Sequence, residues 1–171
     1  MNNHLPSSGI VIRPASFTDI SFIREIAFKT WPPAYEALLG REQVEYMLDL
    51  LYSVKALEDQ MKNQHYFFLA LKNYQPVGFT SFSNIDQGFF KLQKLYVLTS
   101  EQKTGLGLML LETVETVSKS MGAIQLQLNV NRKNPAKGFY ERNGFVVLRE
   151  DDIDIGSGYF MNDYIMQTEL E

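Results

Sequence analysis

Two closely spaced glycines, Gly105 and Gly107, stand between a strand-like run and a long amphipathic segment, and they constrain the fold more than any other feature. Residues 91–98 form a strand-like run that leads into a polar loop, and apolar residues then recur at helical spacing over 106–121. We therefore expect the glycines in the first turn of a helix, where backbone N–H groups lack intrahelical partners. Such donors at the positive end of a helix dipole bind anions, and glycine lets a pyrophosphate approach the backbone closely.

Three kinds of nucleotide-binding turn share this physics, and the neighbouring residues distinguish them. A P-loop requires Lys followed by Ser or Thr, whereas Leu108 and Met109 follow the glycines. A dinucleotide fingerprint requires a third glycine, where this chain has Leu110, and an acidic residue after the next strand, where it has Asn131. The remaining pattern, Gln or Arg-x-x-Gly-x-Gly or Ala after a strand, matches residues 102–107.

A second segment, NPAKGFYERNGF at residues 134–145, follows in the order and at the spacing of a known family. Together the two segments resemble the GNAT superfamily of acyl-CoA-dependent N-acyltransferases. The resemblance implies an α/β (α+β) fold with a mixed, mostly antiparallel central sheet and helices on both faces. It also implies acetyl-CoA as the co-substrate, without a metal.

By this resemblance, the cofactor is expected to contact one strand, the glycine turn and the second segment. The expected residues are Leu95, Tyr96, Val97, Gln102, Lys103, Thr104, Gly105, Leu106, Gly107, Leu108, Asn134 and Tyr140. In GNAT relatives the matching strand carries a β-bulge and splays from its neighbour, so that its backbone pairs with the pantetheine arm. A bulge leaves backbone groups in need of partners, and an amide-rich cofactor supplies them. The side chains of residues 95–97 are then expected in the core.

Tyr140 is the catalytic candidate, because a tyrosine after this phenylalanine commonly protonates the departing CoA sulfur in GNAT relatives. The alternative is a tyrosine that only packs its ring, as we expect of Phe139. Asn134 binds the cofactor or caps its helix, and Asn131 is a rival for the cofactor role. Where some relatives carry a glutamate base, this chain has Lys91, Gln93 and Lys94, which leaves the base unidentified, with a bound water as one solution.

Trp31 and Tyr35 occupy the segment with which GNAT relatives build the acceptor pocket, although an aromatic lid packed on the domain is an equal alternative. The tail around residues 158–164 would supply the opposite wall. Asp163 or Glu36 would then bind a cationic amine, or lie on the solvated surface. His4 and His65 are far apart, and neither a metal site nor a Ser-His triad is expected.

Composition limits the remaining function classes. The chain has 171 residues, no cysteine and a formal charge of −4, so a covalent acyl-cysteine route is excluded and nucleic acid is a poor partner. No apolar run reaches the length of a membrane span, and residues 1–9 lack the apolar core of a signal peptide, from which we expect a cytoplasmic protein that does not bind membranes. The sequence leaves the oligomeric state open, with a homodimer as one alternative.

The remaining pattern predicts a single domain over residues 1–171, with 1–8 as a flexible arm. We expect helices from Ser16 or Thr18 to about residue 30, where Trp31-Pro32-Pro33 stops the helix, and at 42–52, 53–62 and 134–142 besides the glycine helix. Expected strands are 10–14, 66–71, 76–83, 89–98, 123–130, 145–149 and 161–168, with a turn at 84–88 and a polar connection at 151–159.

The leading hypothesis is an N-acetyltransferase that moves acetyl from acetyl-CoA to a primary amine by direct attack in a ternary complex. The acceptor is expected to be a small-molecule amine, a peptide N-terminus or a lysine. A non-catalytic acyl-CoA-binding or regulatory module is the alternative class, kept open by the missing base. A transferase that uses a longer acyl-CoA is a second alternative.

Overall fold

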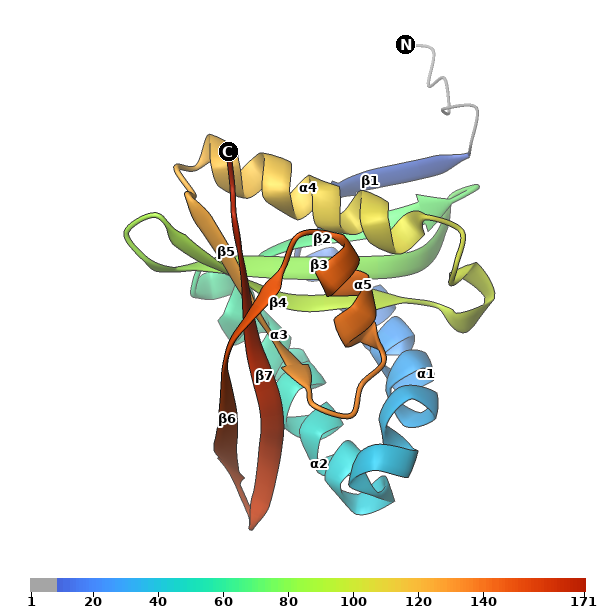
Figure 1. Ribbon diagram of the computed structural model, residues 1–171. Helices are drawn as coiled ribbons and strands as arrows, with labels where there is room; N and C mark the ends of the chain where they lie inside the picture. Colours follow the sequence, from blue (N-terminus) through green and yellow to red (C-terminus); the bar gives the residue numbers. More distant parts are fainter. Residues whose placement is uncertain (1–8) are drawn as a thin grey trace.

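The strands form one seven-stranded sheet in the order β1-β2-β3-β4-β5-β7-β6 in the computed structural model, which describes residues 9–171 (Figure 1). The expected arm at residues 1–8 lies outside the described residues. The strands are β1 (Ile10–Pro14), β2 (Tyr66–Lys72), β3 (Gln75–Asp86), β4 (Phe89–Val97), β5 (Gln125–Asn131), β6 (Val146–Gly156) and β7 (Tyr159–Glu169). The helices are α1 (Ile20–Leu39), α2 (Arg41–Tyr52), α3 (Val54–Lys62), α4 (Leu106–Ser120) and α5 (Ala136–Arg142). Among the described strand pairs only β4 and β5 run parallel, which confirms the mixed, mostly antiparallel sheet.

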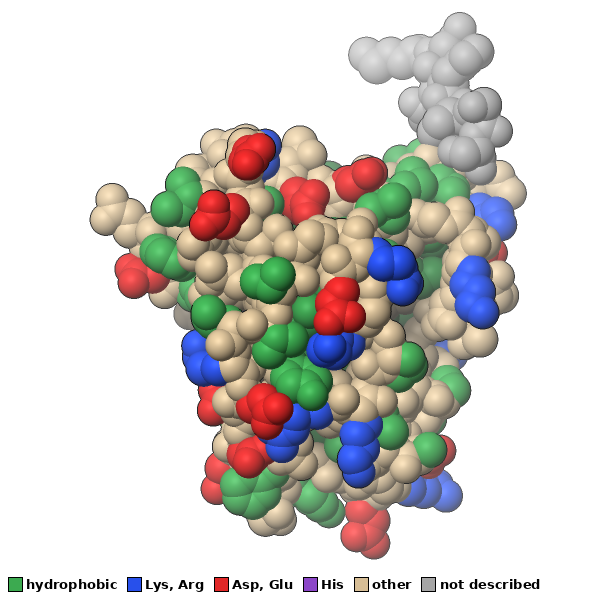
Figure 2. Space-filling view, viewed as in Figure 1, with side chains coloured by type: hydrophobic (Ala, Val, Ile, Leu, Met, Phe, Trp, Pro, Cys, Tyr) green, Lys and Arg blue, Asp and Glu red, His purple; other side chains and the backbone are tan. Residues whose placement is uncertain are grey.

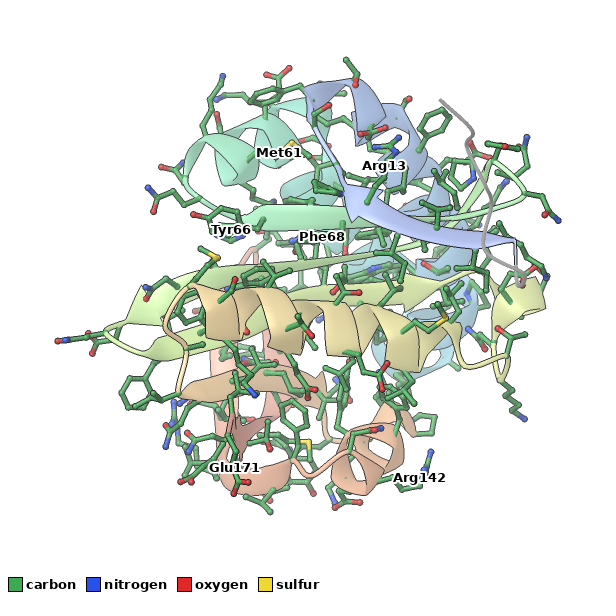
Figure 3. All side chains as sticks on the ribbon, turned by 90° about the horizontal axis from the view of Figure 1, so that it is seen from above. Arg13, Met61, Tyr66, Phe68, Arg142 and Glu171 are labelled. Carbon is green, nitrogen blue, oxygen red and sulfur yellow. The ribbon has the colours of Figure 1, made fainter. Side chains whose placement is uncertain are left out.

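Two groups of helices cover opposite faces of the sheet, as expected. Helices α1, α2 and α3 bury Ile23, Met47 and Leu57 against one face, with Phe67 and Phe79 of the sheet. Helix α4 packs on the other face, with α5 beside it. Seen from above, Met61 of α3 and Arg142 of α5 lie on opposite sides of the molecule, and α4 runs alongside the strands between them (Figure 3). Side chains on one face of the sheet therefore pack against α1, α2 and α3, and those on the other face pack against α4 and α5.

The expectation that the first helix ends at Trp31-Pro32-Pro33 is wrong, because α1 continues through both prolines to Leu39. A proline inside a helix removes one N–H and leaves the carbonyl four residues earlier without its donor. Those carbonyls belong to Phe28 and Lys29, which are exposed to solvent. The buried stripe of α1, which includes Ile26 and Trp31, holds the helix on the core despite the two missing hydrogen bonds.

The expected polar connection at 151–159 is also wrong, since most of it is strand. β6 extends to Gly156, β7 begins at Tyr159, and a tight turn joins them. β6 pairs only with β7 among the described strands, and most of its residues are exposed. Charged side chains are tolerated on such an edge strand, so its acidic composition does not indicate a loop.

Smaller differences concern the ends of elements. β3 extends three residues into the expected turn and ends at Asp86, β5 covers Gln125–Asn131, and α5 begins at Ala136. Gly105 is the N-cap of α4 in the left-handed conformation (φ 87°), so only Gly107 lies in the first turn. The positive φ explains the glycine at 105, because a side chain there would be strained.

No helix formed by residues 9–171 is long and apolar enough to cross a membrane. The same residues contain no group of three or more His, Cys, Asp or Glu side chains placed to hold a metal ion. On the face shown in Figure 2, acidic and basic side chains are interspersed and do not form a field of one sign.

Candidate active site

β4 and β5 separate halfway along their length. Their parallel pairing runs from Phe89 with Gln125 to Leu92 with Leu128 and ends there. Beyond this point β4 continues to Val97 paired only with β3, and β5 continues to Asn131 paired only with β7. The two strands therefore diverge in the middle of the sheet, and β4 has an edge that faces β5 but does not pair with it.

A β-bulge lies at the point of divergence. Ser81 of β3 pairs with Lys94, whereas the next residue of β3, Phe82, pairs with Leu92, so Gln93 is the extra residue. The bulge reverses the alternation of side chains along β4. Leu92 packs in the core under α4, while the Lys94 ammonium lies over the ring of Tyr52 on the opposite face.

The part of β4 beyond Leu92 presents backbone groups toward the place where β4 and β5 have separated, which we call the opening. Leu98 N–H donates to the carbonyl of Val77 on β3 (2.9 Å). Because alternate residues of an antiparallel strand point their backbone groups the same way, Tyr96 also turns toward β3, and Leu95 and Val97 turn away from it. The Val97 carbonyl accepts a hydrogen bond from the Gln102 side chain at 3.4 Å. These backbone groups form an extended, open edge suited to an amide-containing chain.

Helix α4 begins at the end of this edge. Met109 N–H donates to the Gly105 carbonyl (3.1 Å), which is the first hydrogen bond of the helix, so the amides of Leu106, Gly107 and Leu108 have no intrahelical acceptor. The side chain of Leu106 is buried, but Gly107 has none to cover the amides. The helix N-terminus therefore has unpartnered amides, as its sequence predicts, and anion binding there stays a prediction.

The loop before α4 is held in place by its own contacts. The Thr104 hydroxyl donates to the Glu101 carbonyl (2.6 Å), and Glu101 pairs with Lys72 of β2 (2.9 Å). Lys103 has a positive φ of 61° and is exposed. The loop thus places one cation beside the open amides, which favours an anionic ligand at this end of the opening.

Tyr140 of α5 lies on the other side of the divergence. Its ring packs edge-on against Phe139 (5.2 Å between centroids) and Phe145 (5.7 Å). Its hydroxyl has no hydrogen bond within the described part of the chain. Burial and the nearby Tyr35 hydroxyl raise the pKa of the Tyr140 phenol above its ordinary value, so this group is protonated and can donate.

A chain of hydrogen bonds joins α5, α1 and β4. The Asn134 amide donates to the Tyr35 hydroxyl (3.4 Å), and the hydroxyls of Tyr35 and Tyr96 are 3.1 Å apart. Asn134 also accepts from the backbone N–H of Ala136 (2.9 Å). The side chain of Asn131 instead accepts from Lys133 N–H within its own loop. Of the two rival asparagines, Asn134 is therefore the one that contacts the tyrosine cluster.

The residues of α1 considered for the acceptor pocket lie on two sides of the helix. Trp31 and Tyr35 point inward, with ring centroids 4.7 Å apart, and Trp31 lies 5.8 Å from the Tyr96 ring. Pro32 and Glu36 line a groove of about 510 Å³ between α1 and α2 on the outer surface. Glu36 is thus separated from the inward-facing rings, and Trp31 with Tyr35 remain the candidates on the inner side.

The β6–β7 hairpin closes this inner side against α2 (Figure 1). The Tyr46 hydroxyl donates to the Ile155 carbonyl at 2.7 Å, and the Gln43 amide donates to the Phe160 carbonyl at 2.9 Å. Tyr46 also packs on Tyr159 (5.2 Å between centroids). The hairpin therefore packs against α2, and its role as the opposite wall of an acceptor pocket stays a prediction.

Asp163 of β7 brings a buried carboxylate to the same side of the sheet. It is 2% exposed and pairs in register with Asn131, on the part of β5 that has separated from β4. Its one side-chain hydrogen bond among the described residues comes from Asn129, at 3.4 Å. Burial raises the pKa of this carboxyl, while Asn129 and the charges of Lys91 and Arg132 oppose the rise. The carboxylate is thus weakly partnered and suited to accept a proton.

Two lysines of β4 face the same interior. Lys94 is 8% exposed, and its ammonium lies 5.3 Å from the centroid of the Tyr52 ring and 5.9 Å from that of Phe67. Burial lowers the pKa of Lys94 to about 8, and the charge of Lys91 adds to the effect. Burial also lowers the pKa of Lys91, against the attraction of Asp163. Within residues 9–171 neither ammonium has an ion pair.

The family comparison agrees with this geometry. Residues 37–159 match the family described as Acetyltransferase (GNAT) domain, which covers most of the sheet, the open edge of β4, α4 and α5. The chain belongs to the GNAT family of acetyltransferases.

Individual relatives of this GNAT acetyltransferase match 90% or more of the chain. An uncharacterised N-acetyltransferase of Mycobacterium tuberculosis is 28% identical over 155 residues, 90% of this chain and 99% of the relative. The spermidine N(1)-acetyltransferase of Thermoplasma acidophilum is 29% identical over 168 residues, 95% and 98% of the two chains. The crystal structure of the PaiA N-acetyltransferase of T. acidophilum with coenzyme A has a TM-score of 0.80 at 26% identity, covering 94% and 98% of the two chains. A GCN5-related N-acetyltransferase of Rhodopseudomonas palustris has a TM-score of 0.81 at 19% identity and shows the fold alone.

Most of the predicted site residues lie around one opening in this GNAT fold, but sequence reasoning missed how two charged groups join them. The sequence indicates Asp163 only as one of two candidates for binding an amine, and Lys94 only as a residue that stands where some relatives have a glutamate. The alternation of buried and exposed residues in β7 carries a weak signal for Asp163, since a charged residue on a buried face is unusual. No comparable signal marks Lys94, because its direction depends on the bulge at Gln93.

Proposed function

We propose that this GNAT acetyltransferase transfers acetyl from acetyl-CoA to a primary amine by direct attack in a ternary complex. The open edge of β4 that leads to the unpartnered amides of α4 carries the proposal, because it offers amide partners along a line that ends in an anion site. Relatives support it, since T. acidophilum PaiA was crystallised with coenzyme A and a Salmonella typhimurium neighbour with acetyl-CoA.

The proposed cofactor contacts follow the opening from α4 to α5. The amides of Leu106, Gly107 and Leu108 would hold the pyrophosphate, with Lys103 as the nearby cation, and the backbone of Leu95 and Val97 would pair with the pantetheine arm. Gln102 and Thr104 shape the loop, and Asn134 would position the arm from the opposite side. Acetyl-CoA would supply the activated acyl group as a thioester.

The proposed chemistry requires one group that takes a proton and one that gives a proton. Amines are protonated near neutral pH, so the acceptor must lose a proton before it attacks. Asp163 is the buried carboxylate on the acceptor side of the sheet, and we assign it this role, directly or through one water. Tyr140 is protonated and lies across the opening, where its hydroxyl would donate to the departing sulfur.

Thermal melting tests the binding half of the proposal. Saturation at a hundredfold excess over the dissociation constant stabilises a protein by about 2.7 kcal/mol. We expect acetyl-CoA to raise the melting temperature, and NAD to leave it unchanged. No shift with acetyl-CoA, or an equal shift with NAD, would contradict the proposal.

Release of free CoA tests the catalytic half. We expect acceptor-dependent release across a panel of polyamines, amino acids, aminoglycosides and peptides. Binding of acetyl-CoA without acceptor-dependent release from any of them would instead support a non-catalytic acyl-CoA-binding module. The buried carboxylate at Asp163 weighs against that alternative, because the missing base had kept it open.

A further inference from the structure

A group of hydrogen-bond donors without acceptors lies beneath α2 and α3, on the acceptor side of β4. Its central member is Lys94, a residue that is 8% exposed and whose ammonium makes no hydrogen bond or ion pair within the described residues. An unpaired ammonium in the interior is costly, because burial removes its water without supplying a counter-charge. The rings of Tyr52 and Phe67 offset only part of this cost.

Ser81 supplies a second donor at the same place. It pairs in register with Phe67 on one side and Lys94 on the other, so it lies between them on the sheet. Because the Lys94 ammonium approaches the Phe67 ring, it must extend over Ser81. The Ser81 hydroxyl is fully buried and has no hydrogen-bond partner among residues 9–171.

Two further groups complete the cluster. His65 lies two residues before Phe67, its Nδ1 is buried, and the described chain offers this atom no partner. Burial lowers the pKa of the His65 imidazole, and the charges of Lys94 and Lys91 lower it further. Lys91 faces the same side from the other end of the bulge, with Asp163 as its neighbour. The cluster therefore contains two cations and two neutral groups able to donate, and no anion contacts Lys94.

We propose that Lys94 and Ser81, with His65 and Lys91 beside them, form a subsite for a carboxylate carried by the acceptor amine. This inference rests on the proposed function and narrows its substrate class to amines that bear a carboxylate, such as amino acids or short peptides. A bound carboxylate supplies the counter-charge that Lys94 lacks and an acceptor for the Ser81 hydroxyl. The same cations repel a polyamine, although a relative at 29% identity is named a spermidine N(1)-acetyltransferase.

Pairs of amines that differ only by a carboxylate test the proposal. Suitable pairs are 5-aminopentanoate with pentylamine, and L-lysine with 1,5-diaminopentane. Dissociation constants are measured by calorimetry in the presence of saturating CoA, so that this readout does not depend on turnover. A hydrogen-bonded charge pair is worth about 1.5–3 kcal/mol, so we expect the carboxylate-bearing member of at least one pair to bind roughly 10- to 100-fold more tightly. The ratio of kcat/KM values should change in the same direction.

Lys94→Met links any preference to the proposed subsite. It keeps an unbranched side chain and removes the buried charge, so the variant should fold. It should bind the two members of each pair about equally. Ser81→Ala should reduce the preference by less. Lys62→Met, which removes an exposed cation at the end of α3, is the matched control and should keep the native preference.

Three results would overturn the inference while leaving acetyl transfer intact. These are equal binding of both members of every pair, preference for the decarboxylated members, and a preference that survives in Lys94→Met. A failure of the proposed function looks different: it is the absence of CoA release from every amine, whatever the calorimetry shows. Carboxylate-dependent binding that is lost in Lys94→Met would support the subsite even then.

Discussion

The hydroxyls of Tyr35 and Tyr96 lie 3.1 Å apart, although one belongs to α1 and the other to β4. Tyr35 is a predicted acceptor-side residue and Tyr96 lies on the predicted cofactor strand, so this contact marks where the two halves of the proposed reaction meet. Asn134 of α5 extends the contact by donating to Tyr35. Burial raises the pKa of both phenols, and the pair therefore stays protonated and hydrogen-bonded near neutral pH.

Replacing Gly107 by alanine separates cofactor binding from folding. The added Cβ would lie 3.9 Å from both Leu95 and Phe139, which is ordinary contact, and alanine favours a helix by about 1 kcal/mol over glycine. We expect a protein of equal or higher stability whose affinity for acetyl-CoA falls about 10- to 100-fold, because the methyl group keeps a phosphate from the amides. Gly107→Val should abolish the acetyl-CoA-dependent thermal shift.

Thr116→Ala, on the exposed face of α4, is the control for this variant. It also raises helix propensity but should leave acetyl-CoA affinity unchanged. Native affinity in Gly107→Ala and Gly107→Val would place the pyrophosphate elsewhere.

Tyr140→Phe tests the proposed general acid. Phenylalanine retains the packing on Phe139 and Phe145, so stability should change little. A CoA thiolate is already a fair leaving group, which puts the loss at the low end of general-acid effects, and we expect kcat to fall about 10- to 100-fold with acetyl-CoA affinity nearly unchanged. Unchanged kcat, with chemistry shown to limit the rate, would reduce Tyr140 to a packing residue.

Asp163→Asn tests the proposed base through the pH profile. A base must be deprotonated, so native kcat/KM should fall as the pH drops through the pKa of Asp163, which burial raises above the ordinary value for aspartate. The charges of Lys91, Arg132 and Asp151 face Asp163 and influence its pKa, and therefore the pH at which this acidic limb of the profile falls. The variant should lose about 10²- to 10⁴-fold in kcat and show no such limb.

Stability provides the independent check on Asp163. A raised pKa in the folded state means that the buried charge is unfavourable, so native stability is lower above this pKa than below it. Asp163→Asn should then be at least as stable as the native protein at pH 7. Asp151→Asn, which changes the partner of Asp163 across the strands, should retain the acidic limb. Loss of the limb in Asp151→Asn and its retention in Asp163→Asn would reverse the assignment.

The lowered pKa of Lys94 should make the folded protein more stable as the pH rises above 8. Its pKa is about 8 in the folded protein, against roughly 10.4 for an unperturbed lysine. Below pH 8 both states are protonated and the full penalty of the buried charge, about 3 kcal/mol, opposes folding. As the pH rises from about 8 to 10.4, the folded state loses its proton first and the penalty disappears.

Urea unfolding of the native protein and Lys94→Met between pH 7 and pH 10 measures this effect. Lys94→Met should be more stable at pH 7 by up to about 3 kcal/mol, and its advantage should shrink as the pH rises. A difference in unfolding free energy that is constant with pH would show that Lys94 is not the titrating group.

Substitutions at Trp31 and Tyr35 are expected to change the KM for the acceptor and to leave acetyl-CoA affinity unchanged. Tyr35→Phe removes the hydrogen bonds to Tyr96 and Asn134 but keeps the ring, and we expect a higher KM for the acceptor with acetyl-CoA affinity spared. Trp31→Phe should act similarly. It is preferable to Trp31→Ala, because truncating this buried side chain would cost about 3–5 kcal/mol of stability. Weakened CoA binding with unchanged acceptor kinetics would remove both residues from the acceptor site.

The sequence alone determined the parts of this protein that depend on local chemistry. Gly105, Gly107 and the helical spacing after them predict an anion-binding helix start because backbone conformation and unpartnered amides are properties of adjacent residues. Strand alternation located most of the sheet for the same reason, and the two motifs together identified the GNAT family.

Only the tertiary structure decided which charged and aromatic groups share the acceptor side. α1 passes through Pro32 and Pro33 because its buried face packs on the sheet, and this continuation carries Tyr35 to Tyr96. One extra residue at Gln93 turns Lys94 to the side of Lys91, where simple alternation would have placed them on opposite faces. Asp163 joins them through the pairing of β7 with β5, which are far apart in sequence. Such placements depend on packing and register between distant segments, and those are absent from any local pattern.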